Sequence, residues 1–104
     1  MARLVPLNVR VSLTDAAARI VAFRPADIQT LIIQVLTGSS PVSLGDEGNT
    51  TYAGGYPMIA GDVFSLSWED FTPEERKSMD LVEIWGICDT GLTGTVSVFG
   101  WARQ

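Results

Sequence analysis

The chain has 104 residues, of which 46% are hydrophobic and 18% are charged, and its formal net charge is −5. This length suits one domain, and the apolar content is too high for a disordered chain. Seven basic residues stand against twelve acidic ones without forming a local cluster, so we expect no nucleic-acid partner. The apolar runs are far shorter than the roughly 20 residues that cross a bilayer, so we expect no membrane partner.

Histidine is absent, and cysteine occurs once, at Cys88. The chain therefore lacks the usual general base, the commonest metal ligand and any Ser-His or Cys-His nucleophile pair. One cysteine can form neither an intramolecular disulfide nor a structural zinc site. Cys88 shares a predicted strand face with Val82 and Ile84, which favours a small buried hydrophobe. We expect no catalytic residue, no cofactor and no metal, and hence a protein that is not an enzyme.

Alternation of side chains predicts the first two strands. Apolar residues at Val9, Val11 and Leu13 alternate with polar ones, as in a strand with one buried face. Residues 14–18 indicate a turn into a second strand, although their alanines leave a short helix possible there. The second strand, at 19–23, ends before a proline, because proline lacks the amide donor of a strand ladder.

The middle of the chain contains one strong strand signal and one long segment without a period. Residues 29–36 are rich in β-branched and apolar side chains, which is typical of a strand. A four-residue loop at 37–40 then predicts a hairpin whose return strand includes Val42 and Leu44. Residues 45–62 contain five glycines and no sustained period, so we expect a long loop there.

The last third contains the most regular alternation, at residues 63–69. This alternation puts Trp68 on the apolar side of its strand, so we expect it in the core. A Thr-Pro-Glu-Glu capping box predicts one or two helical turns near residues 72–79. Two further strands are predicted at 81–88 and 95–101.

About seven short strands joined by turns predict an all-β fold, a single antiparallel β-sandwich that spans residues 1–104. A jelly-roll-like and an immunoglobulin-like strand order both remain open, because periodicity does not encode the connections between sheets. Residues 1–7 are unusually apolar for a terminus and suggest a docking arm. Its apolar residues are Leu4, Val5, Pro6 and Leu7.

Aromatic residues supply the other candidate contacts. Tyr52 and Tyr56 flank two glycines in the long loop, which suits a sugar-stacking platform, a protein interface, or rings folded back over the sandwich edge. Trp85 and Trp101 fall on the polar side of their strands, so one of them is expected at the surface.

Turn chemistry within residues 28–101 resembles that of small β-sandwich virion proteins of tailed bacteriophages. The segments are Leu31–Val35, Thr37–Gly45 with its Val-Ser-Leu-Gly step, and Gly54–Asp62 with its Gly-Gly-Tyr-Pro-Met-Ile-Ala-Gly approach to a strand. Closing segments such as Leu-Val-Glu-Ile-Trp and Gly-Thr-Val-Ser-Val are similar to the C-terminal strands of that family, so the resemblance covers residues 28–101. It implies a capsid decoration (cement) or head-fibre protein that is synthesised in the host cytoplasm and lies on the outer capsid surface.

The resemblance implies that the partners are the major capsid protein or other virion subunits. Apolar anchors in the arm and the loops would supply the contact area, namely Leu4, Val5, Pro6, Leu7, Tyr52, Tyr56 and Trp101. A closed homo-oligomer, with a trimer preferred, would cover the sheet edges without filament growth. One alternative is a carbohydrate- or receptor-binding module of a phage fibre or tail, using Tyr52, Tyr56 and Trp101. Another is a small hydrolase or lyase that uses acidic residues such as Glu69 and Glu83.

Overall fold

In the computed structural model, all residues are described except 1–3, 47–50, 79 and 104. The described residues form eight strands, one α-helix and two short 3-10 turns, which confirms the all-β class. The strands are β1 (Leu4–Leu13), β2 (Ala18–Phe23), β3 (Ile28–Val35), β4 (Val42–Gly45), β5 (Tyr56–Met58), β6 (Val63–Ser67), β7 (Val82–Cys88) and β8 (Gly94–Arg103). The 3-10 turns are η1 (Pro25–Asp27) and η2 (Trp68–Asp70), and the helix is α1 (Pro73–Lys77).

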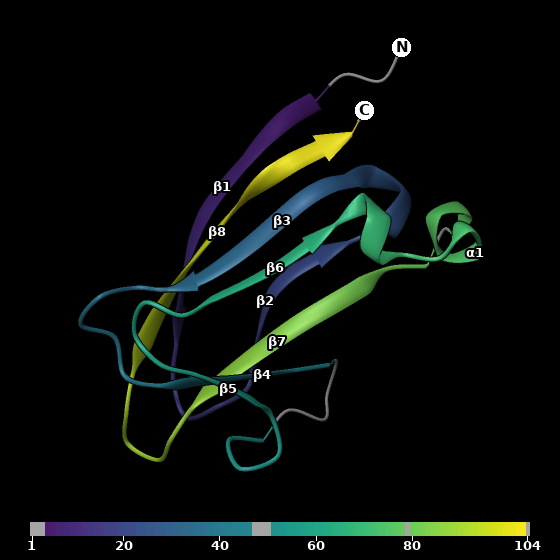
Figure 1. The fold of residues 1–104 in the computed structure, drawn as a ribbon. Coiled ribbons are helices and arrows are strands. Elements are labelled where there is room, and N and C mark those ends of the chain that lie inside the picture. Colours follow the sequence, from purple (N-terminus) through teal and green to yellow (C-terminus); the bar gives the residue numbers. More distant parts are fainter. Residues whose placement is uncertain (1–3, 47–50, 79, 104) are drawn as a thin grey trace.

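The strands form two antiparallel sheets that pack face to face (Figure 1). The first sheet has the order β1-β8-β3-β6, and the second has the order β2-β7-β4-β5. The first four strands therefore alternate between the sheets. Of the last two strands, β7 lies inside the second sheet and β8 lies inside the first. This is the strand order of an eight-stranded jelly roll. The immunoglobulin-like alternative is wrong, because that fold keeps its first two strands in one sheet and here they lie in different sheets.

The core lies between the sheets and is built by the inward-facing half of each strand. Val96 and Val98 of β8 project inward beside Ile33 and Val35 of β3, and all four side chains are at most 1% exposed. The second sheet contributes Val42, Leu44, Ile84 and Cys88 from its central strands. None of the described helices is long and apolar enough to cross a bilayer.

Residues 4–7 do not form a free arm, because they belong to β1; their expected contact with a partner stays a prediction. Leu4 pairs with Arg103 and Leu7 pairs with Gly100, so this part of the chain is held along β8. Leu7 is half-buried and packs against the core. Residues 1–3 of the expected arm lie outside the described residues.

Two further expectations for the middle of the chain are corrected. Residues 37–40 do not close a hairpin, because β3 and β4 lie in different sheets and the loop crosses between them. The expected long loop contains a strand, β5, in which Met58 pairs with Val42 of β4. This strand has only three residues and includes Pro57, so its sequence gives no strand signal.

The segment after β6 confirms one expectation and corrects another. Thr72 caps α1, since its Oγ1 accepts a hydrogen bond from the Glu75 amide (3.2 Å) and its own amide donates to Glu75 Oε1 (2.8 Å). Trp68 is not a core residue, because the strand ends at Ser67 and the chain turns into η2. There the Ser67 amide donates to Asp70 Oδ2 (2.7 Å), and Trp68 lies half-buried with the Arg76 guanidinium 5.1 Å from its ring centroid.

Candidate functional site

The side of the first sheet that faces away from the core is the candidate site, and we call it the outer face. Cross-strand pairing arranges its side chains in rows, because paired residues project to the same side of a sheet. The rows contain Pro6, Trp101, Thr30 and Ser67; then Asn8, Phe99, Ile32 and Ser65; then Arg10, Ser97, Gln34 and Val63; then Ser12 and Thr95.

As far as its side chains are described, the outer face contains no acidic residue, and Arg10 is the one charged residue in the rows named above. The whole chain, in contrast, has twelve acidic residues. The acidic residues that the structure describes lie in loops and short helices, except Glu83 on β7, which belongs to the other sheet. Surfaces that become buried in protein contacts are depleted of charged residues in this way.

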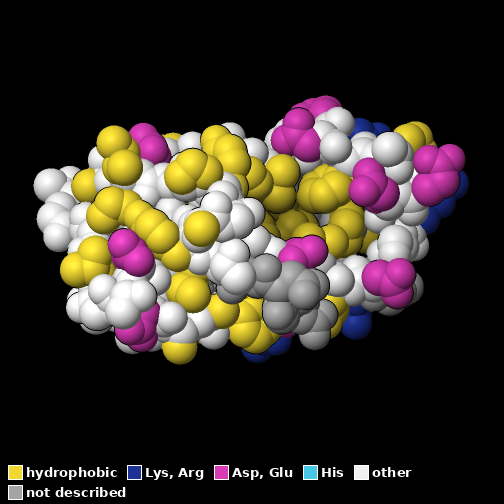
Figure 2. All heavy atoms as spheres, turned by 90° about the horizontal axis from the view of Figure 1, so that it is seen from below, with side chains coloured by type: hydrophobic (Ala, Val, Ile, Leu, Met, Phe, Trp, Pro, Cys, Tyr) yellow, Lys and Arg dark blue, Asp and Glu magenta, His cyan; other side chains and the backbone are white. Residues whose placement is uncertain are grey.

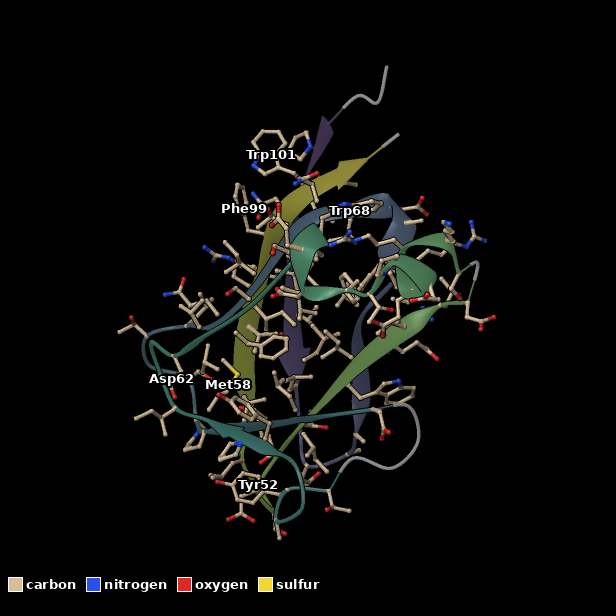
Figure 3. All side chains as sticks on the ribbon, turned by 45° about the vertical axis from the view of Figure 1, so that its right-hand side comes forward. Tyr52, Met58, Asp62, Trp68, Phe99 and Trp101 are labelled. Carbon is tan, nitrogen blue, oxygen red and sulfur yellow. The ribbon has the colours of Figure 1, made fainter. Side chains whose placement is uncertain are left out.

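One end of the outer face contains two exposed aromatic rings. Phe99 and Trp101 are two residues apart on β8, so they project to the same side, and Figure 3 shows them side by side. Their ring centroids are 6.4 Å apart in an edge-to-face arrangement, and the residues are 42% and 40% exposed. Pro6 and Ile32 lie next to them across the sheet. These four residues are the aromatic patch.

The other end of the outer face is hollowed and polar. The hollow has a volume of about 420 Å³ and lies beside the loop after β3 and the loop before β8. We call it the hydroxyl hollow, because its lining is mostly Ser and Thr: Arg10, Ser12, Leu36, Thr37, Gly38, Ser39, Thr93, Gly94 and Thr95. The four residue steps along β8 from Thr95 to Phe99 separate the hollow from the aromatic patch by about 13 Å.

The tyrosines and Trp101 do not form one platform. Figure 3 shows Trp101 and Tyr52 at opposite ends of the molecule. Tyr52 is half-buried, and its carbonyl oxygen accepts a hydrogen bond from Ser43 Oγ (2.7 Å), which ties the loop to the second sheet. Of the expected interface residues, Pro6 and Trp101 therefore share the aromatic patch and the tyrosines lie elsewhere. Trp101 is also the exposed tryptophan that the sequence predicts, since Trp85 is half-buried.

Tyr56 lies at an open side of the sandwich. Its ring meets Phe64 of the first sheet edge-on at 6.0 Å between centroids, and the residue is 60% exposed. Together with Leu44, Gly45 and Ile84 these rings line a small apolar hollow of about 220 Å³. Figure 2 shows hydrophobic side chains lining a hollow on this side of the molecule.

The backbone of Leu4 and Val5 lies in β1, but their side chains are outside the described part of the structure.

The groups considered for chemistry are dispersed. Cys88 is 1% exposed and its Sγ lies 3.8 Å from the Leu13 carbonyl oxygen, which confirms the prediction of a buried hydrophobe. Burial, with a smaller contribution from Asp15, raises the pKa of this thiol, so it stays protonated at neutral pH. Glu83 Oε1 lies 3.3 Å from Arg19, and Glu69 Oε2 accepts a hydrogen bond from Ser67. Across the described ranges, no three His, Cys, Asp or Glu side chains gather as a metal site.

Sequence reasoning missed Phe99, Ile32 and Arg10 as site residues. The spacing of Phe99 and Trp101 within a predicted strand already put both rings on one face, and that signal could have identified the patch. Ile32 and Arg10 join the face only through the pairing of β1 and β3 with β8, which no local pattern encodes.

Comparisons of the chain with protein-family models, with curated proteins and with solved structures found no match.

Proposed function

We propose that this chain is a docking protein of a phage particle, a capsid decoration (cement) protein that stabilises the head shell by seating its aromatic patch on shell subunits. In this function the chain works by protein contacts and catalyses no reaction. The contacts would add buried area across the joints between subunits, which is how an added protein can strengthen a shell.

The observation that carries the proposal is the pair of exposed rings on a face without acidic residues. Large aromatic side chains dominate the energetics of protein contacts, and Trp and Arg are enriched among the residues that contribute most. Phe99 and Trp101 are such anchors. A partner that covers the patch desolvates both rings without burying an unpaired carboxylate of this chain.

The choice of a virion partner rests on the resemblance of residues 28–101 to small phage β-sandwich proteins. The charge of the chain agrees with that choice, since a net charge of −5 disfavours contact with DNA inside or outside a shell.

Binding to empty shells of the phage that encodes the chain tests the proposal. Phe99→Ser combined with Trp101→Ser removes both anchors while leaving the inward-facing core unchanged. We expect the amount of protein that sediments with shells at a fixed concentration to fall by about tenfold or more. The matched control is Leu92→Ser, which removes a side chain of similar exposure (43%) outside the outer face.

The control should sediment with shells as the wild type does, and circular dichroism should confirm that all variants are folded. Wild-type protein that ignores shells, or a double variant that still binds them at full strength, would refute the proposal.

A further inference from the structure

The hydroxyl hollow brings together several exposed side chains whose hydrogen-bonding groups have no partner among the described residues. In the part of the chain that the structure describes, the Arg10 guanidinium and the hydroxyls of Ser12, Thr37 and Thr93 make no hydrogen bond or ion pair. All four side chains line the same hollow, and no carboxylate is among the lining residues. The hollow therefore presents one positive charge and several free hydroxyls to a ligand.

Hydrogen bonds within the protein already hold part of the lining of the hollow in place. Ser39 Oγ accepts from the Thr95 amide (3.0 Å) and donates to the Ser40 carbonyl oxygen (2.8 Å). The Leu36 amide donates to the Thr95 carbonyl oxygen (3.0 Å), which fastens the loop after β3 to the start of β8. A site that is already formed loses less entropy when it binds.

The composition of the hollow selects the chemistry of its ligand. A Ser or Thr hydroxyl both donates and accepts, as a sugar hydroxyl does, so the two can pair in either direction. A guanidinium binds a carboxylate through two parallel hydrogen bonds, and Arg10 is the single cation available. A phosphate is a poorer match, because phosphate sites commonly add a helix N-terminus or further cations, and the lining has neither.

We propose that the hydroxyl hollow binds a carboxylated sugar. Arg10 holds the carboxylate, and Ser12, Thr37 and Thr93 bond to the ring hydroxyls. A volume of about 420 Å³ falls in the range of small-ligand sites and accommodates one or two sugar rings. The site lies at the opposite end of the outer face from the aromatic patch, so it is additional to the docking function and does not depend on it.

Three small probes test the proposal in titrations followed by the backbone amide signals of isotope-labelled, full-length protein. Methyl glucuronide carries both the ring hydroxyls and the carboxylate. Methyl glucoside is its neutral match, and acetate supplies the carboxylate without the ring. We expect methyl glucuronide to shift the amides of Thr37, Gly38 and Gly94, with an affinity about tenfold or more above that of either other probe.

Matched variants assign the contact. Arg10→Gln keeps a polar side chain but removes the positive charge, and Thr37→Val keeps the shape but removes the hydroxyl. Both should weaken glucuronide binding, the first by about tenfold. Phe99→Ser, at the far end of the same face, should bind the sugar as the wild type does.

Equal binding of acetate or of methyl glucoside, or an unchanged affinity in Arg10→Gln, would overturn the proposal. So would a glutamate-rich peptide that shifts the same amides more strongly than the sugar, since the hollow would then recognise a protein carboxylate. Shell binding by Arg10→Gln is a separate readout and reports on the docking function alone.

Discussion

At the scale of single residues, Gly100 permits the close approach of β8 and β3. It lies on the inner side of β8, between Leu7 of β1 and Leu31 of β3. A Cβ at this position would overlap the carbonyl oxygen of Thr30 and would lie 3.0 Å from the Cα of Leu31. The sequence shows only a glycine in a predicted strand. Its role depends on the register shift of β3 between Ile28 and Thr30, which no local pattern predicts.

Gly100→Ala should therefore destabilise the protein strongly, because the added methyl group meets backbone atoms that cannot rotate away. We expect the free energy of unfolding to fall by about 3 kcal/mol, measured by urea denaturation. Phe99→Ser, one residue earlier and on the exposed side of the same strand, should cost far less. A Gly100→Ala protein as stable as the wild type would show that β3 and β8 can move apart here.

At the scale of elements, the sequence predicts the strands that alternate or are rich in β-branched residues, and it misses β5, which has neither signal. Residues 9–13, 29–36 and 63–69 all contain strands close to the predicted places, because each buries one side of an extended segment. β5 is missed because a three-residue edge strand has no room for a period. Residues 4–7 form a strand and not a free arm, because they pair with β8, and Pro6 can lie in an edge strand without donating to the ladder.

The difference between an arm and a strand can be measured on neighbouring residues of β1. Leu7→Ser removes a half-buried side chain that packs against the core, so the free energy of unfolding should fall by about 2 kcal/mol. Asn8→Ser changes an exposed residue on the outer face and should alter it by less than about 0.5 kcal/mol. Thermal or urea unfolding compares the two. Equal, negligible effects would restore the interpretation of residues 4–7 as a free arm.

At the scale of the whole molecule, each sheet ends in edge strands that pair with a neighbour on one side only. One of these is β1, which has ten residues. The sheet order could not be predicted from the sequence. β1 and β8 pair from opposite ends of the chain, and the alternation of side chains in one strand does not indicate which strand it pairs with. A long unpaired edge favours association with another chain unless the edge is covered. A closed trimer, the oligomer that we propose, covers edges without open-ended growth.

Light scattering coupled to size-exclusion chromatography should give the mass of three chains for the wild type. Val9 lies in the middle of the β1 edge and is 49% exposed, so Val9→Lys places a charge where a neighbouring chain would pack. This variant should elute with the mass of one chain. Leu92→Lys adds the same charge outside the sheets and should leave the trimer intact. A wild-type mass of one chain would exclude the trimer.

The pairing of Leu4 with Arg103 has a practical consequence for anyone who labels this protein. Both ends of the described chain lie at one end of the sandwich (Figure 1), and the aromatic patch begins only two residues further along each strand. An affinity tag or a fluorescent protein fused to either end would thus emerge beside Trp101 and crowd the docking surface. A tag inserted in the turn at Gly91, between β7 and β8, would project from the opposite end and leave that surface clear.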